Sequence, residues 1–232
     1  DRMALIGVPN GRTQGGLPQI KIGAGSTAML TVRAPGCLIA NIGFNGASST
    51  GGGILLDDDG STKTAFGTTI ENCHFKNCKG ATATDSRTGG AIQLSGAPWQ
   101  ILIRGNNFYK NVGDVVLKNT SNSVPQDVII EGNIFMGTAA AVDCHLYLAG
   151  GSGIASVSVR HNTFAAVLPA LVSGSVVRYA DLTGCTGDFS NNTFAGSYTT
   201  TGFGAAKAAA KIPTTVGLAH CYSGGGLIVR EA

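Results

Sequence analysis

The stretch 103–164 decides the fold, because it contains the same short motif three times. The motif reads apolar-x-x-x-x-Phe and occurs as Ile103-Arg-Gly-Asn-Asn-Phe108, Ile130-Glu-Gly-Asn-Ile-Phe135 and Val159-Arg-His-Asn-Thr-Phe164. Further copies flank this stretch: Ile39-Ala-Asn-Ile-Gly-Phe44, Ile70-Glu-Asn-Cys-His-Phe75 and Phe189-Ser-Asn-Asn-Thr-Phe194. The phenylalanines follow one another at intervals of 31, 33, 27, 29 and 30 residues. A period of this size indicates a solenoid, a propeller or another repeat array.

The segments between the motifs are short and β-rich, at 54–56, 91–94, 115–117, 146–148 and 176–179, and no helical periodicity appears among them. Propeller blades need about 40–50 residues, whereas about 30 residues accommodate three short strands and three turns. The high glycine content (35 of 232) and low charge (12%) fit a turn-rich β repeat. We therefore predict an all-β fold, a right-handed parallel β-helix with coils of about 30 residues.

The regular repeat predicts where the β-helix ends. We expect the solenoid to occupy residues 1–198, and residues 199–232 to form a C-terminal capping or tail segment. Within that segment the alanine-rich stretch 204–211 predicts two turns of helix, and 227–229 is the last candidate strand. The longest excursions, 76–92 and 119–125, are where functional residues would be added to the scaffold.

Two columns of the motif predict structural ladders. The sixth position is Phe in all six copies (Phe44, Phe75, Phe108, Phe135, Phe164 and Phe194), so the rings should stack inside the solenoid. The fourth position is Asn in four consecutive copies (Asn106, Asn133, Asn162 and Asn192). Asn tolerates left-handed backbone angles, and its amide can bond to the same group one rung away. We predict an internal asparagine ladder at one corner.

The second motif position alternates in charge, as Glu71, Arg104, Glu131 and Arg160. Rungs lie about 4.8 Å apart, so opposite charges on adjacent rungs are within ion-pair reach, and the two glutamates are about 10 Å apart. One interpretation is an exposed ion ladder, worth little per pair. The other is a carboxylate pair just beyond the roughly 6.5–9.5 Å of inverting glycosidases. Arg104 between the glutamates would keep both ionised, which does not suit a general acid.

Composition excludes several classes of function. The net charge is +3, from 16 basic and 13 acidic residues, which gives no footprint for nucleic acid. No apolar run approaches the roughly 20 residues that span a bilayer, so we expect no membrane partner.

The six cysteines include no C-x-x-C pair and are expected to be free and buried. Cys73-His74-x-x-x-Cys78 lacks two further ligands, so we expect no metal and no cofactor.

The repeat resembles the right-handed parallel β-helix superfamily over about residues 20–194, on the x-Gly/Asn-Asn-x-Phe coil motif. That superfamily includes pectate lyases, polygalacturonases and the β-helical spikes and surface proteins of bacteriophages. The Gly-, Thr-, Asn- and Ser-rich texture and the scarce charge are most similar to the phage members. The resemblance therefore implies a virion location, contacts with capsid or tail proteins and a homotrimer.

The enzymes of this superfamily imply a motif set that the chain lacks. Polygalacturonases carry Asn-Thr-Asp, Asp-Asp, Gly-His-Gly and Arg-Ile-Lys, and only Asp57-Asp58-Asp59 is similar to one of these. With Gly60, these acids fit a solvated turn after the 54–56 strand, with weak calcium binding as the functional alternative. They show no histidine or arginine companion in the same or adjacent motif columns. Trp99 fits either a cap on the core edge or a sugar-stacking platform.

Three hypotheses remain open. The first is a non-catalytic structural protein of a virus particle, either a capsid-decorating protein or a tail spike segment. The second is a polysaccharide lyase or glycoside hydrolase acting on a surface polysaccharide, for which Asp57, Asp58 and Asp59 are the candidate catalytic residues. The third is a module that binds a surface glycan without cleaving it.

Overall fold

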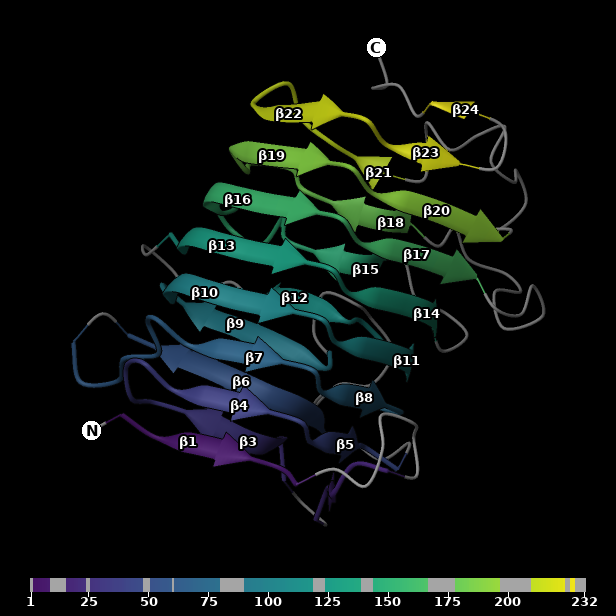
Figure 1. The fold of residues 1–232 in the computed structure, drawn as a ribbon. Coiled ribbons are helices and arrows are strands. Elements are labelled where there is room, and N and C mark those ends of the chain that lie inside the picture. Colours follow the sequence, from purple (N-terminus) through teal and green to yellow (C-terminus); the bar gives the residue numbers. More distant parts are fainter. Residues whose placement is uncertain are drawn as a thin grey trace.

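A computed structural model gives the structure of the chain. It describes residues 2–8, 16–23, 26–47, 51–59, 61–79, 90–118, 124–138, 144–166, 178–196, 210–223 and 226–227. All regular structure in these ranges is β, arranged as sheets of eight, nine and seven strands (Figure 1). We name them sheets A, B and C.

Sheet A contains β1 (Ala4–Ile6), β4 (Leu38–Ala40), β7 (Thr69–Glu71), β10 (Trp99–Arg104), β13 (Gln126–Glu131), β16 (Ala155–Arg160), β19 (Gly187–Ser190) and β22 (Val216–Ala219). Sheet B contains β2 (Gln19–Lys21), β5 (Gly43–Asn45), β8 (His74–Lys76), β11 (Asn107–Asn111), β14 (Ile134–Thr138), β17 (Thr163–Ala166), β20 (Thr193–Gly196), β23 (Tyr222–Ser223) and β24 (Gly226–Leu227). Sheet C contains β3 (Ala28–Val32), β6 (Gly52–Asp58), β9 (Ile92–Gly96), β12 (Val115–Lys118), β15 (Cys144–Tyr147), β18 (Arg178–Asp181) and β21 (Ala210–Lys211).

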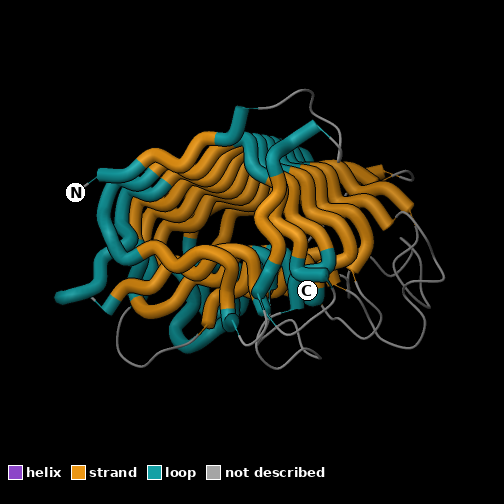
Figure 2. The backbone as a smooth tube through the Cα atoms, turned by 90° about the horizontal axis from the view of Figure 1, so that it is seen from below, coloured by secondary structure: helices purple, strands orange, loops and turns teal. Residues whose placement is uncertain are grey.

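From β1 to β23 the chain visits the sheets in the fixed order A, B, C, so each complete coil contributes one strand to each sheet; β24 then returns to sheet B. Every strand pairs in parallel with its counterparts on the neighbouring coils, except for the last pair, β23 with β24, which is antiparallel. Seen along the stack, successive coils overlie one another around a common interior (Figure 2). The predicted all-β parallel β-helix is confirmed.

Six stacked phenylalanine rings form the central column of the interior. Phe44, Phe75, Phe108, Phe135, Phe164 and Phe194 pair in register across sheet B. Their centroids lie 4.9–5.1 Å apart and adjacent planes differ by at most 17°. Each ring is at most 2% exposed, so the motif fills one continuous core.

The asparagines of the fourth motif position form a ladder at the corner between sheets A and B. The Oδ1 of Asn133 accepts hydrogen bonds from the backbone N–H of Asn106 (2.9 Å) and from its side-chain amide (3.1 Å). Asn162 and Asn192 repeat both contacts one rung further along. Each of the four Nδ2 groups also donates to a backbone carbonyl of the preceding coil. The backbone N–H and C=O groups at this buried corner therefore find their hydrogen-bond partners in asparagine side chains.

The left-handed backbone angle at this corner belongs to the residue before each ladder asparagine, which corrects the expected conformation. These residues are Gly105, Gly132, His161 and Asn191, with φ between 53° and 64°. Asn41 and Asn72 have the same conformation (φ 58° and 52°) before Ile42 and Cys73, which hold the ladder position in the first two motif copies. The ladder asparagines themselves are not in this region. The left-handed residue makes the bend, and the amide of the next residue is thereby turned inward.

A further rung lies beyond the boundary expected at 198. β21, β22 and β23 add parallel strands to sheets C, A and B. Leu218 pairs with Phe189, and Ser223 occupies the position next to Phe194, so this coil follows the same register without its own phenylalanine. Of the helix expected at 204–211, Ala210 and Lys211 are in a strand instead, and the remainder lies outside the described residues.

Candidate functional site

The three consecutive aspartates lie where β6 ends. Asp57 and Asp58 are inside the strand, in register with Ser95 and Gly96 of β9, and Asp59 follows it. The expected solvated turn therefore begins at Asp59 rather than at Asp57. The strand runs on because sheet C provides β9 as a partner up to Asp58.

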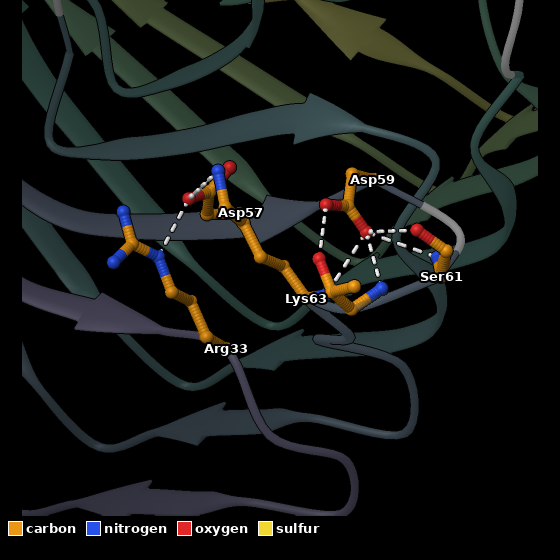
Figure 3. Close-up of polar contacts among 6 residues, drawn as sticks. Arg33, Asp57, Asp59, Ser61 and Lys63 are labelled. Carbon is orange, nitrogen blue, oxygen red and sulfur yellow. Dashed lines mark hydrogen bonds and ion pairs between the residues drawn. The ribbon is translucent and has the colours of Figure 1, made fainter.

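Asp57 is held by two cations. Its Oδ2 lies 2.7 Å from Arg33 Nε and 3.6 Å from Lys63 Nζ (Figure 3). Arg33 follows Val32, which pairs with Leu56, so the arginine comes from the preceding rung. The expectation that no arginine accompanies the aspartates concerned only the same or adjacent motif columns. The arginine that pairs with Asp57 lies outside the six-residue motif, in sheet C, and was not predicted. Asp57 therefore connects two rungs and the following turn through ion pairs.

Asp58 and Asp59 organise the turn that leaves β6. Asp58 is buried (4% exposed), and its Oδ2 accepts the backbone N–H of Ala65 at 2.8 Å. The Oδ1 of Asp59 accepts the backbone N–H groups of residues 61, 62 and 63 at 2.8–2.9 Å, and its Oδ2 accepts the Thr62 hydroxyl (Figure 3). The N–H of Lys63, followed by the Thr62 hydroxyl, lowers the pKa of Asp59 far below its ordinary value. Asp59 therefore remains ionised and cannot act as a general acid.

The three carboxylates do not share one space. Asp57 faces Arg33 and Lys63, Asp59 faces its own turn, and only Asp58 lines a groove. An acid–base pair needs two groups directed at the same region of the substrate. The candidate catalytic trio is therefore not brought together as one site.

The alternating charges of sheet A form two separate ion pairs. Arg104 lies 2.6 Å from Glu71 Oε2, and Arg160 lies 2.9 Å from Glu131 Oε2. Both arginines are about half exposed, at 51% and 41%. Each glutamate thus pairs with the arginine of the following rung, and such exposed pairs contribute little stability.

These pairs line a shallow groove of about 440 Å³ at the A-to-B corner. Its lining includes Glu71, Arg104, Glu131 and His161. His161 is there because it occupies a left-handed corner position (φ 55°). The groove is wide and mixed in charge, and both carboxylates that face it are compensated by arginine.

The core contains a buried polar cluster that the sequence analysis did not predict. His145 Nδ1 lies 2.5 Å from Asp114 Oδ2, and Asn111 Nδ2 donates to Asp114 Oδ1 at 2.9 Å. The side chains of His145 and Asp114 are 0% and 1% exposed, and the imidazole contacts both Phe135 and Phe164 at a tilt. The signal was a histidine within the otherwise apolar strand β15. Because it is enclosed in the core, this cluster joins sheets B and C and offers no surface to a substrate.

The described cysteines are buried in the core and unpaired, as residues with a packing role are. Cys37, Cys73, Cys78, Cys185 and Cys221 are free and buried, whereas the side chain of Cys144 lies outside the described residues. Burial raises the pKa of Cys73 and of Cys78 to about 12. Within the described ranges, no three His, Cys, Asp or Glu side chains converge as metal ligands. The same ranges contain no helix long and apolar enough to cross a membrane.

Trp99 stands at the opposite corner, where sheet C leads into sheet A. It is the first residue of β10, is 43% exposed, and contacts Phe66 with ring centroids 5.2 Å apart. A second groove of about 440 Å³ passes this pair and is also lined by Asp58 and Gln126. Trp99 is thus partly exposed beside Phe66, a position that fits both a cap on the core edge and a sugar-stacking platform.

Comparison with known proteins agrees with the coil geometry. The family described as "Right handed beta helix region" matches residues 22–206, most of the chain. No curated protein and no solved structure gave a significant match. The matched range covers the motif copies from Phe44 to Phe194 and the strands from β3 to β20. The chain belongs to the right-handed β-helix family.

Proposed function

We propose that this chain is a non-catalytic structural protein of a virus particle, either a capsid-decorating protein or a segment of a tail spike. The observation that carries the proposal is the unbroken internal stacking. A phenylalanine column and an asparagine ladder connect successive coils through the core. Such stacking makes a rigid rod without any cofactor, which is what an exposed particle component requires.

The state of the acids supports a structural role. Asp57, Glu71 and Glu131 are paired with basic side chains, and Asp59 is bound to its own turn. Glycan hydrolysis or elimination needs a positioned acid–base pair, or a metal with a base. These four carboxylates are used instead to connect rungs and to fix a turn.

The assembly that we propose is a homotrimer in contact with other virion proteins of the capsid or tail. Exposed apolar side chains in the described residues favour assembly, because exposed apolar groups are costly in isolation. The exposed apolar side chains include Met3, Ile6 and Val8 at the first rung and Ile134 on sheet B. Trimerisation would bury such surface.

A polysaccharide lyase or glycoside hydrolase is the second candidate, and one observation favours it. Glu71 and Glu131 line the same groove from alternate rungs, with His161 beside them. Release of either glutamate from its arginine would be required before it could act as an acid. This requirement makes the structural role the better supported of the two.

Incubation with bacterial surface polysaccharides tests the proposal, with a reducing-end assay for hydrolysis and an ultraviolet assay for unsaturated products. We expect no product. Turnover would overturn the non-catalytic role, and two variants would locate the site: Asp58→Asn for the aspartate cluster and Glu131→Gln for the charged groove.

Particles purified from an infected culture should contain the protein as a stoichiometric component, and its absence from them would overturn the virion role.

A further inference from the structure

We propose that the groove beside Trp99, which we call the Trp99 groove, is a binding site for an uncharged saccharide. Its lining residues are Asp58, Thr64, Phe66, Ala97, Trp99, Val124 and Gln126. The groove lies at the C-to-A corner, away from the charged groove at the A-to-B corner. The inference adds a ligand to the proposed scaffold and does not depend on that role.

The coil geometry places the aromatic pair and the amide in one row along the solenoid axis. Trp99 pairs in register with Gln126 of the next rung. Phe66 belongs to the preceding rung, since the N–H of the adjacent Gly67 donates to the Trp99 carbonyl at 2.9 Å. Three rungs span about 10 Å, so the row is long enough for an extended chain ligand rather than a single small group.

The local backbone explains why the indole is exposed. Pro98 is buried beside it, and Gln100 after it adopts a left-handed conformation (φ 55°), which turns the corner. Trp99 is consequently 43% exposed with one side against Phe66, instead of being folded into the core. A large aromatic side chain held open by the fold is a feature of ligand sites.

The polar groups of the groove fit hydroxyl-rich ligands. Gln126 offers an amide donor and acceptor and Thr64 a hydroxyl. Asp58 also lines the groove, with its Oδ2 already accepting the Ala65 N–H. Among the described residues, no side-chain partner occupies the Gln126 amide or the indole N–H of Trp99. A sugar ring presents C–H groups on one face and hydroxyls on its edge, so it can stack on Trp99 and bond to these groups together.

Charge selects against an acidic ligand. Asp58 is the one ionisable side chain among the described lining residues, and Asp57 and Asp59 flank it in sequence. The two nearby cations, Arg33 and Lys63, are already paired with Asp57. A nucleotide or an acidic polysaccharide would therefore meet like charge from Asp58 and no basic side chain among the described lining residues.

The sequence makes the test direct, because Trp99 is the only tryptophan in 232 residues and its fluorescence reports this groove alone. The full chain is titrated with maltohexaose, cellohexaose and chitohexaose, and with a hexamer of galacturonic acid as the charged comparison. We expect a saturable emission change with at least one neutral hexasaccharide and a weaker response or none with the acidic one.

Calorimetry on variants assigns the site. Trp99→Ala should weaken binding of the responding hexasaccharide at least about tenfold, and Gln126→Ala should weaken it by about threefold. Tyr222→Ala is the matched control, since Tyr222 is an aromatic side chain exposed by 51% on sheet B, and it should bind as the original chain does. Thermal melts of the three variants establish that each is folded.

Three results would overturn the inference. They are no emission change with any neutral hexasaccharide, unchanged affinity in Trp99→Ala, and preference for the galacturonate hexamer over every neutral sugar. None of these would bear on the structural role, which the cleavage assay and the particle analysis test separately.

Discussion

Replacement of Asn133 by alanine tests the asparagine ladder at its centre. The Asn133 side chain makes four hydrogen bonds: Oδ1 accepts from the N–H and the amide of Asn106, and Nδ2 donates to Ile103 O and Asn162 Oδ1. Its residue is 1% exposed, so water cannot replace the lost partners without opening the corner. Asn133→Ala leaves the Asn106 N–H without this acceptor and the Ile103 carbonyl without this donor.

The expected loss follows from those orphaned groups. Each buried unsatisfied group costs about 1–3 kcal/mol, so we expect Asn133→Ala to lower the free energy of unfolding by roughly 3–5 kcal/mol. Asn192 Oδ1 likewise accepts from the N–H and the amide of Asn162, and its Nδ2 donates to Val159 O. Towards the next rung, however, this Nδ2 contacts the Cys221 sulfur at 3.9 Å in place of an asparagine oxygen. Asn192→Ala should therefore cost about 1 kcal/mol less than Asn133→Ala, because one weak sulfur contact replaces an amide bond.

Urea denaturation followed by circular dichroism measures both changes, and Asn107→Ala is the matched control. Asn107 lies next to the ladder in β11, but it is only half-buried and faces outward, so its loss should stay within about 0.5 kcal/mol. Equal losses for Asn133→Ala and Asn107→Ala would refute the ladder as a source of stability. Equal losses for Asn133 and Asn192 would refute the argument that bonding to both sides matters.

Three further predictions concern the core, the thiols and the assembly. Phe135→Ala should lower the free energy of unfolding by about 3–5 kcal/mol in the same urea assay, since its ring is fully buried between two others; a loss near zero would contradict the column. Because burial raises the pKa of Cys73 and Cys78 to about 12, iodoacetamide at pH 8 should leave both unmodified in the folded chain and alkylate both in urea, as mass spectrometry can show. Light scattering at micromolar concentration should give the mass of a trimer, and a stable monomer would contradict that assembly.

The repeat period was sufficient to predict the fold because the motif repeats the same physical requirement in every coil. The phenylalanine at the sixth position of each motif copy must contact the rings above and below it, and this fixes the register of sheet B. The buried asparagine must find an amide or backbone partner at the same height. Inward positions are therefore readable from spacing alone, as for Phe108 and Asn106.

The sequence did not predict features in two situations. In one, a coil lacks the phenylalanine and asparagine of the motif; in the other, a contact involves residues outside the motif. The last coil has Ser223 next to Phe194 and Cys221 next to Asn192, so its strands carried no repeat signal. The pairing of Arg33 with Asp57 depends on the register of β3 with β6, which no repeated residue indicates. The Asp114–His145 pair joins a corner to a strand, and no repeated residue marks it in the sequence.

The contrast between inward and outward columns explains where function can reside in such a chain. Inward columns repeat the same residue over several consecutive rungs because each side chain is in contact with its equivalents on the neighbouring rungs, so a different residue in the middle of a column would leave a void or an unpaired group. Outward columns have no such requirement, and the corner row that contains Phe66, Trp99, Gln126 and Ala155 changes at every rung. A binding site on a solenoid is consequently defined by a local departure from the repeat at an outward column. Trp99 is such a departure, because no other coil has a tryptophan and this one is held open beside polar groups that a saccharide can use.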